Sequence, residues 1–191
     1  LEKLNFEKEI DKQGKIDVLW SPNDTFLTQI IKEPISSTGP RISSELSFAG
    51  RFLVLIPLSN RISVSQKIKS KKERDRLKKL IEEFRPKGFG VIIRTVAQGK
   101  KVAELEKDLQ SLYNQWLSLC SKINGAKPPS RILSELNRSS SILRDLFDDQ
   151  FKGVYCNDKN LCYELKDYIL HIAPKKTSVV KYYKSDKPIF E

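Results

Sequence analysis

A long helical periodicity between residues 98 and 125 constrains the fold of this chain more than any other feature. Apolar side chains recur there every three or four positions over about 22 residues, which places them along one face of an α-helix. They are Val102, Leu105, Leu109, Leu112, Trp116, Leu119 and Ile123. Gln98-Gly99 turns into this helix, Asn124-Gly125 caps its end, and Pro128-Pro129 follows as a linker. We therefore expect one dominant helix that ends just before a linker.

Upstream of this helix the sequence predicts several strands and one shorter helix. Alternating or β-branched apolar residues indicate strands at 25–31, 42–48, 52–56 and 91–93, with a bend at Ala49-Gly50. Apolar residues at helical spacing predict an amphipathic helix from about Lys71 to Phe84. The segment from Leu1 to Gly14 is charged and is expected to be irregular or helical.

Downstream of the linker, helical and strand patterns alternate. Helices are predicted at about 139–147 and 159–172, and strands at 153–156 and 179–182. An alternation of this kind points to a small α/β unit. Together with the strand-rich region upstream, it places the chain in the α+β class.

The charge of the chain limits its partners. The 191 residues carry a formal net charge of +11, an excess that favours a polyanion, either nucleic acid or an anionic membrane. Membrane binding would need a basic helix with a broad apolar face or a lipidation signal, and the sequence has neither. It also has no apolar run of about 18 residues and no signal peptide, so we expect no membrane span and a cytoplasmic location.

Residue types that usually carry catalysis are sparse. Three cysteines have a spacing that matches no zinc site, and we interpret them as free thiols: Cys120, Cys156 and Cys162. The single histidine, His171, lies in an apolar helical stretch and is interpreted as structural. The doublet Asp148-Asp149 lies beside a predicted strand–helix junction, but no third carboxylate is evident to complete a Mg²⁺ site. We therefore expect neither a catalytic residue nor a metal ligand in this chain.

One site has a pattern that suits phosphate binding. The apolar strand Val91-Ile92-Ile93 delivers Arg94 and Thr95 at its carboxyl end, where ligands often bind in α/β arrangements. Arginine presents a planar fork of donors that matches two phosphate oxygens, and threonine adds a hydroxyl donor. Gly99-Lys100-Lys101 opens the next helix, so backbone N–H groups and positive charge are expected to face the same ligand. The alternative is an arginine that leaves the core and pairs with a surface carboxylate.

A second basic feature is the run of lysines and arginines that leads into the shorter helix. Its members are Lys67, Lys69, Lys71, Lys72, Arg74, Arg76, Lys78 and Lys79. Most such runs are solvated helix faces, and helical spacing spreads these charges around the surface. We expect them to attract a nucleic-acid backbone without reading its sequence.

An ordered series of motifs resembles the ribonuclease E/G family. The matching segments are QIIKEP (29–34), GPR (39–41), LSFAGRFLVLIP (46–57), VSQKI (64–68), GVIIRTVA (90–97), LRDLF (143–147), VKYY (180–183) and PIF (188–190). The resemblance covers residues from about 15 to 191. A series of this length is more specific than any single motif.

Members of that family cut single-stranded RNA internally and prefer a 5′-monophosphorylated end. The resemblance implies that residues 1–44 are the C-terminal part of an S1 domain, an OB-type barrel that binds single strands. Residues 45–127 are then a mixed 5′-sensor region with two helices, and residues 128–191 part of a small α/β ribonuclease-H-like subdomain. The family's Mg²⁺-binding catalytic region is expected beyond Glu191, so the chain is expected to be an inactive fragment of an endoribonuclease. The full-length protein is expected to be a homo-oligomer.

The resemblance also implies which residues contact RNA. In the family an Arg-Thr pair grips the terminal phosphate, and Arg94 and Thr95 match that pair. Gly50 and Val54 match residues that line the same pocket. Further RNA contacts are expected at three basic residues, Lys32, Arg41 and Lys67.

The chain departs from the family pattern at two places. Some members have an Arg pair where this chain has Gln66-Lys67, and a Lys where it has Thr38.

Three functional hypotheses remain open. The leading hypothesis is an RNA-binding, 5′-monophosphate-sensing part of an E/G-type endoribonuclease that acts in RNA processing and decay. The second is a scaffold or interaction module that packs against partner subunits. The third is an intact small nuclease that uses Asp148 and Asp149.

Overall fold

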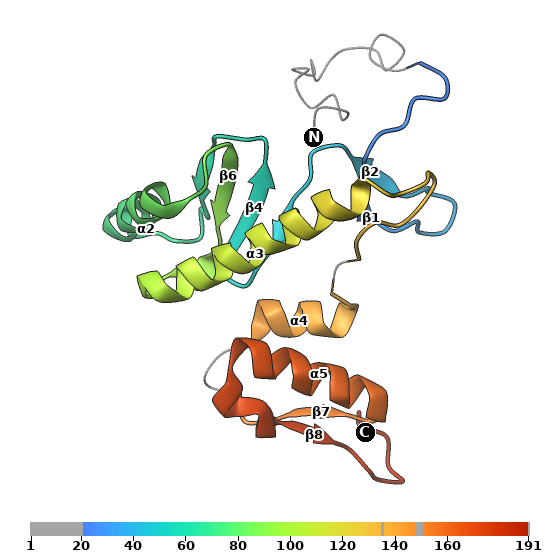
Figure 1. The fold of residues 1–191 in the computed structure, drawn as a ribbon. Helices are drawn as coiled ribbons and strands as arrows, with labels where there is room; N and C mark the ends of the chain where they lie inside the picture. The colour runs from blue at the N-terminus through green and yellow to red at the C-terminus, as the bar shows by residue number, and fades with distance from the viewer. Residues whose placement is uncertain (1–20, 135, 148–150, 191) are drawn as a thin grey trace. The chain divides into compact units, whose positions relative to one another are not determined.

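The chain forms two compact units. A computed structural model describes residues 21–134, 136–147 and 151–190, and the units span Leu1–Leu133 and Ser134–Glu191 (Figure 1). The predictions for the segment up to Gly14 and for Asp148-Asp149 lie outside the described residues.

A four-stranded mixed sheet forms the centre of the first unit, with strand order β3-β4-β6-β5. Its strands are β3 (Phe48–Ala49), β4 (Leu53–Pro57), β5 (Ile62–Val64) and β6 (Phe89–Ile93). β4 is antiparallel to both β3 and β6, whereas β5 runs parallel to β6. A parallel neighbour needs a crossover connection, and helix α2 (Lys71–Phe84) supplies it between β5 and β6. The predicted helix from Lys71 to Phe84 is confirmed.

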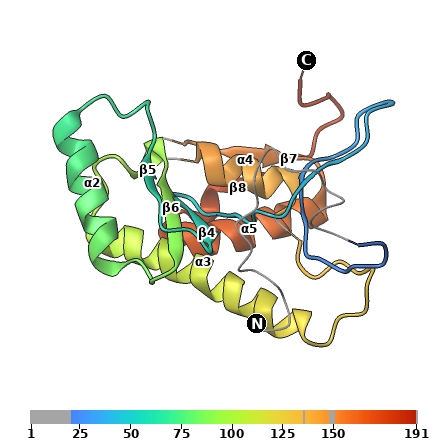
Figure 2. The same ribbon diagram turned by 90° about the horizontal axis from the view of Figure 1, so that it is seen from above.

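The long helix predicted from periodicity is α3 (Val102–Ile123), and its apolar stripe is buried as expected. The buried stripe consists of Leu105, Leu109, Leu112, Trp116 and Leu119. These side chains share one core with Leu77 and Ile81 of α2 and with alternate residues of the sheet. Figure 2 shows both helices beside the strands of this sheet.

Only one face of the sheet enters this core. Leu53 pairs with Ile93 and Leu55 with Val91, and all four side chains are fully buried. Side chains alternate between the two faces of a strand, so the intervening pair Val54 and Ile92 occupies the opposite face. There Val54 is half-buried, and Ile92 keeps 38% of its surface exposed. The chain therefore leaves the carboxyl end of β6 beside the sheet face that carries Val54 and Ile92, which is partly exposed to solvent.

The amino-terminal strands differ from the prediction. β1 (Gln29–Lys32) and β2 (Arg41–Ser43) form a separate two-stranded antiparallel sheet, and the expected continuous strand over 42–48 is wrong. The Gln29 side chain explains the break, because its amide donates to the Ser47 carbonyl (3.0 Å) and its oxygen accepts the Ser47 N–H (2.8 Å). A side chain thereby satisfies backbone groups that a continuous ladder would have paired.

The second unit pairs two parallel strands beside helices. It contains α4 (Arg138–Leu146), β7 (Val154–Cys156), α5 (Lys159–Ile172), the 3₁₀ segment η2 (Pro174–Val179) and β8 (Val180–Tyr182). The helices and strands predicted here are confirmed to within one or two residues. Its core consists of Leu143, Phe147, Cys156, Cys162, Leu165, Ile169 and Val180.

The cysteines are free, as predicted: Cys156 and Cys162 are buried, and Cys120 is half-buried. His171 is largely exposed, and its Nδ1 lies 2.8 Å from the carbonyl oxygen of Asp167 in the preceding turn of α5. The mixed composition of helices and sheets in both units confirms the α+β class. Within the described residues, no helix has the length and apolar character needed to span a membrane.

Candidate functional site

Arg94 lies where β6 leaves the sheet, and the backbone of β4 holds it there. Its N–H donates to the Phe52 carbonyl (2.9 Å), which extends the β4–β6 ladder by one residue. By strand alternation its side chain is on the open face with Val54 and Ile92. The guanidinium Nη1 donates to the carbonyl oxygens of Gly50 (2.7 Å) and Arg51 (3.4 Å).

Thr95 is exposed at the start of the short 3₁₀ segment η1 (Thr95–Ala97). Its Oγ1 lies 2.9 Å from Ser65 Oγ, and either hydroxyl can be the donor. Ser65 is fixed beside it, because its N–H donates to the Ile93 carbonyl (2.9 Å). Ser65 lies in the VSQKI motif but was not predicted as a site residue, because its contact with Thr95 depends on β5 pairing with β6.

Gly50 and Val54 lie on either side of the turn that joins β3 to β4. Gly50 is buried, and its N–H donates to the Leu53 carbonyl (2.8 Å) across the turn. Val54 pairs with Ala49 on β3 and with Ile92 on β6. The structure therefore brings Gly50 into direct contact with Arg94 and puts Val54 on the same sheet face.

The expectation for Gly99-Lys100-Lys101 is wrong for the backbone groups. The Gly99 N–H donates to Glu73 Oε1 (2.8 Å), and the Lys101 N–H donates to Glu104 Oε2 (3.1 Å). The Glu104 carboxylate thus occupies the positive start of α3, and the Glu73 carboxylate binds the loop that precedes it. The sequence pattern could not show this, because Glu73 comes from a different helix.

Glu73 forms a compact charged cluster under this loop. Arg76 grips both of its carboxylate oxygens, with Nε–Oε2 and Nη2–Oε1 distances of 2.7 Å each. The hydrogen bonds from Arg76 and from the Gly99 N–H lower the pKa of Glu73 from its usual 4.5 to about 2. Arg76 also donates to the Lys100 carbonyl (3.3 Å), so α2 anchors the segment that follows Thr95.

Two cationic side chains lie over the Phe52 ring, beside the turn between β3 and β4. The guanidinium carbon of Arg51 lies 5.3 Å from the centre of the Phe52 ring, and Lys100 Nζ lies 5.4 Å from the same centre. Lys100 is also 3.3 Å from Glu104. These side chains add local positive potential beside Arg94.

The three further residues predicted to contact RNA fall into two groups. Lys67 is exposed, and its N–H donates weakly to Ser65 Oγ (3.4 Å), which places it next to the hydroxyl of Thr95. Lys32 and Arg41 are exposed partners across the separate β1–β2 sheet. They form a basic pair of their own on a different sheet.

The run of lysines and arginines that leads into α2 also contains two kinds of residue. Some form hydrogen bonds within the fold, and the others are exposed. Arg74 donates to the Ser65 carbonyl (2.7 Å) and Arg76 is bound to Glu73, so both arginines serve the fold. The exposed members are Lys67, Lys69, Lys71, Lys72, Lys78 and Lys79. The prediction of a solvated basic surface therefore applies to the lysines.

The described residues include side chains of the types that usually bind a divalent metal. No group of three or more His, Cys, Asp or Glu side chains there is arranged to hold an ion.

Comparison with known sequences identifies the family. A sequence profile of the ribonuclease E/G family matches residues 47–191, which is more than half of the chain. The chain belongs to the ribonuclease E/G family. It is 31% identical to ribonuclease G of Escherichia coli over 166 residues, which cover 86% of this chain and 34% of that relative. Ribonuclease G of Haemophilus influenzae is 30% identical over 186 residues (97% and 38%), and ribonuclease E of Nostoc sp. 27% over 179 residues (92% and 26%).

This ribonuclease E/G family chain spans about a third of the length of the curated relatives it matches. The region matched by the family profile contains Gly50, Val54, Ser65, Arg94 and Thr95. The grouped polar and glycine residues therefore all fall within the family-matched segment, whereas the β1–β2 sheet precedes it.

Proposed function

We propose that this chain binds single-stranded RNA and senses its 5′-monophosphate, as part of an endoribonuclease that acts in RNA processing and decay. The observation that carries the proposal is the meeting of Arg94 with Gly50, next to the hydroxyl pair Thr95 and Ser65. These groups come from three chain segments and converge at one end of the sheet, where β5 and β6 end and β4 begins.

The chemistry of a terminal phosphate suits this group of residues. A 5′-monophosphate carries about 1.5 to 2 negative charges at pH 7, whereas an internal phosphodiester carries one and a 5′-hydroxyl none. The hydrogen bonds that Arg94 Nη1 donates to the Gly50 and Arg51 carbonyls orient the guanidinium. A guanidinium binds oxyanions through pairs of parallel N–H donors. In the Ser65–Thr95 pair each hydroxyl can donate to the other, so one O–H can turn to a phosphate oxygen. Val54 and Gly50 shape the apolar side of the pocket.

The basic residues outside the pocket suit a supporting role. Lys67 lies beside Thr95, and Lys32 and Arg41 form the exposed pair on β1–β2. They would attract the RNA backbone without selecting its end or its sequence. This division assigns end recognition to Arg94 and Thr95.

We further propose the family's order of parts for the units of this chain. The β1–β2 sheet would be the end of an OB-type S1 domain (residues 1–44), and the four-stranded sheet with α2 and α3 the 5′-sensor (residues 45–127). The β7–α5–β8 arrangement of residues 128–191 would belong to a ribonuclease-H-like subdomain. We propose a cytoplasmic location. The full-length protein is proposed to be a homo-oligomer that hydrolyses RNA in a Mg²⁺-dependent reaction.

The test compares two RNA decamers of identical sequence, one with a 5′-monophosphate and one with a 5′-hydroxyl, by fluorescence anisotropy of a 3′ label. Charge-assisted hydrogen bonds contribute about 1.5–3 kcal/mol, so the wild-type chain should prefer the phosphorylated end by about 10-fold or more. Arg94→Ala should bring the two affinities together. Arg61→Ala is the matched control, because Arg61 is exposed and precedes β5, at the opposite end of the sheet.

Arg61→Ala should weaken the binding of both RNAs equally and leave the preference for the phosphorylated end unchanged. Equal affinity of the wild-type chain for both ends would contradict the proposal. A preference that survives Arg94→Ala would show that another group senses the phosphate.

A further inference from the structure

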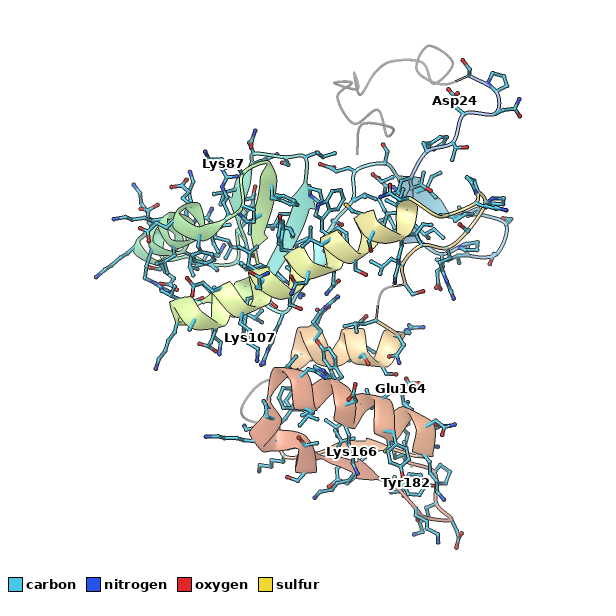
Figure 3. The ribbon with its side chains drawn as sticks, viewed as in Figure 1. Asp24, Lys87, Lys107, Glu164, Lys166 and Tyr182 are labelled. Carbon is cyan, nitrogen blue, oxygen red and sulfur yellow. The ribbon has the colours of Figure 1, made fainter. Side chains whose placement is uncertain are left out.

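One half-buried carboxylate beside the proposed pocket has no part in phosphate binding itself. Asp108 lies on α3 between exposed residues and the buried stripe, and its carboxylate faces the turn between β3 and β4. Its neighbour Lys107 extends from α3 into solvent, away from the sheet (Figure 3). An ionisable group directed towards a backbone turn in this way calls for a structural or functional reason.

The carboxylate of Asp108 collects three consecutive backbone donors. Oδ2 accepts the N–H groups of Phe52 and Leu53 at 2.9 Å each, and Oδ1 accepts the N–H of Arg51 at 3.1 Å. Three such bonds fix both the path of the turn and the orientation of its peptide planes. The carbonyl groups of the same turn therefore have defined directions.

Those carbonyl groups are the ones that hold Arg94. The Gly50 carbonyl belongs to the Gly50–Arg51 peptide, whose N–H Asp108 binds, and it accepts Arg94 Nη1 at 2.7 Å. The Phe52 carbonyl accepts the backbone N–H of Arg94 at 2.9 Å. A continuous chain of hydrogen bonds thus runs from Asp108 through the turn to both the backbone and the guanidinium of Arg94.

Gly50 is required where the carboxylate and the turn meet. A Cβ at this position would lie 2.6 Å from Asp108 Oδ2 and 2.8 Å from Oδ1, closer than such atoms can approach. Asp108 cannot easily yield, because its short side chain is tied to three donors. The glycine that the family resemblance places in the pocket thus admits the carboxylate behind the turn.

We propose that Asp108 is a positioning residue for the 5′-phosphate pocket, which sets the orientation of Arg94 through the Gly50–Leu53 turn without touching RNA. This inference rests on the proposed function. Burial raises the pKa of the Asp108 carboxyl, while the three backbone N–H groups and the charge of Arg94 oppose that rise.

Asp108→Asn is the sharpest perturbation. The side chain keeps its shape, but one carboxylate oxygen becomes an NH₂ group that faces a backbone donor instead of accepting from it. The matched control is Glu106→Gln, which makes the same change in charge at an exposed position on the same helix. Far-UV circular dichroism and a melting curve verify that each variant is folded at the assay temperature.

The readout is the affinity for 5′-monophosphate and 5′-hydroxyl decamers, measured separately. Asp108→Asn should lower the affinity for the phosphorylated RNA by about 3- to 10-fold and leave that for the 5′-hydroxyl RNA within about 2-fold. Glu106→Gln should change neither preference nor fold. In an Arg94→Ala background, Asp108→Asn should have no further effect on the preference, because its action passes through Arg94.

The outcomes separate this inference from the function on which it rests. If the wild-type chain does not discriminate, the proposed function fails. If it discriminates and Arg94→Ala abolishes the preference while Asp108→Asn retains it, only the positioning role of Asp108 is wrong. A uniform loss for both RNAs would likewise contradict it, since that pattern marks a general structural role.

A second variant keeps the test decisive should Asp108→Asn fail to fold. Asp108→Glu retains the charge but moves the carboxylate outward by one methylene group. It should reduce the preference for the phosphorylated RNA at least 3-fold. An unchanged preference in a folded Asp108→Glu chain, or two positioning variants that both fail to fold, would show that Asp108 serves stability rather than the orientation of Arg94.

Discussion

Replacing Glu73 by Gln tests how the loop behind Thr95 is anchored. The carboxylate accepts the Gly99 N–H at 2.8 Å and two guanidinium bonds from Arg76 at 2.7 Å each. A glutamine keeps one acceptor oxygen but loses the charge, and its NH₂ group faces a donor of Arg76. The substitution therefore removes at least one charge-assisted hydrogen bond and the attraction between unlike charges.

The magnitude follows from the depressed pKa of Glu73. A fall from 4.5 to about 2 corresponds to roughly 3.4 kcal/mol at about 1.36 kcal/mol per pH unit. The side chains of Glu73 and Arg76 are 17% and 39% exposed, so solvent screens part of this energy. We expect Glu73→Gln to lower the free energy of unfolding by about 1–2 kcal/mol at pH 7.

The lowered pKa of Glu73 also determines how the effect of the substitution on stability depends on pH. A carboxyl group with a depressed pKa stabilises the fold above its unfolded-state pKa and loses that contribution as the pH falls towards the folded-state value. The difference in free energy of unfolding between wild type and Glu73→Gln should therefore be constant from pH 7 to about 5. It should become smaller between about pH 4.5 and 3.

Urea unfolding, monitored by Trp116 fluorescence in a Trp20→Phe background, measures this gap for the first unit. Trp116 is buried in the core of that unit, so its emission reports the relevant transition. Glu82→Gln is the matched control on α2, because Glu82 lies 3.9 Å from Lys78 and both are half exposed. A gap below about 0.3 kcal/mol at pH 7, or one that does not change down to pH 3, would refute this account of the anchor.

Further predictions concern the core, a tight backbone contact, a thiol and the ligand. Leu105→Ala should destabilise the first unit by about 2–5 kcal/mol in the same unfolding assay, because Leu105 is fully buried. Gly90→Ala should also destabilise it, by about 1–3 kcal/mol, since the new Cβ would lie 2.6 Å from Ser59 Oγ and 2.9 Å from the Arg61 carbonyl. Burial raises the pKa of Cys162 to about 11, so iodoacetamide at pH 8 should alkylate it about 100-fold more slowly in the folded chain than in urea. The preference for 5′-monophosphorylated RNA should fall between pH 7.5 and 5.5 in anisotropy titrations, because the second pKa of the phosphate is about 6.

Periodicity predicted the helices because their burial is local in sequence. α2, α3 and α5 begin and end where the apolar spacing indicated, since each stripe covers one continuous surface. β5 was missed, because its three residues, Ile62–Val64, become a strand only by pairing with β6. The strand expected over 42–48 was wrong for a related reason, the contact of Gln29 with Ser47 eighteen positions away.

The proposed pocket was predictable only in part. Arg94 and Thr95 follow an apolar strand directly, so the sequence alone marked them as a possible anion site. Asp108 gave no such signal, because its charged neighbours on an amphipathic helix indicate a face that is exposed to solvent. Its role depends on a turn more than fifty residues upstream, and only the folded chain brings the two together.

An NMR titration of the ¹⁵N-labelled chain tests the central claim most directly. Amide signals of Gly50, Thr95 and Ser65 should shift on addition of a 5′-monophosphorylated RNA decamer and shift much less with its 5′-hydroxyl counterpart. Signals of the β1–β2 pair Lys32 and Arg41 should respond to both RNAs alike, because these residues would contact only the backbone. Identical shifts at Gly50, Thr95 and Ser65 with the two RNAs would contradict end recognition by this site.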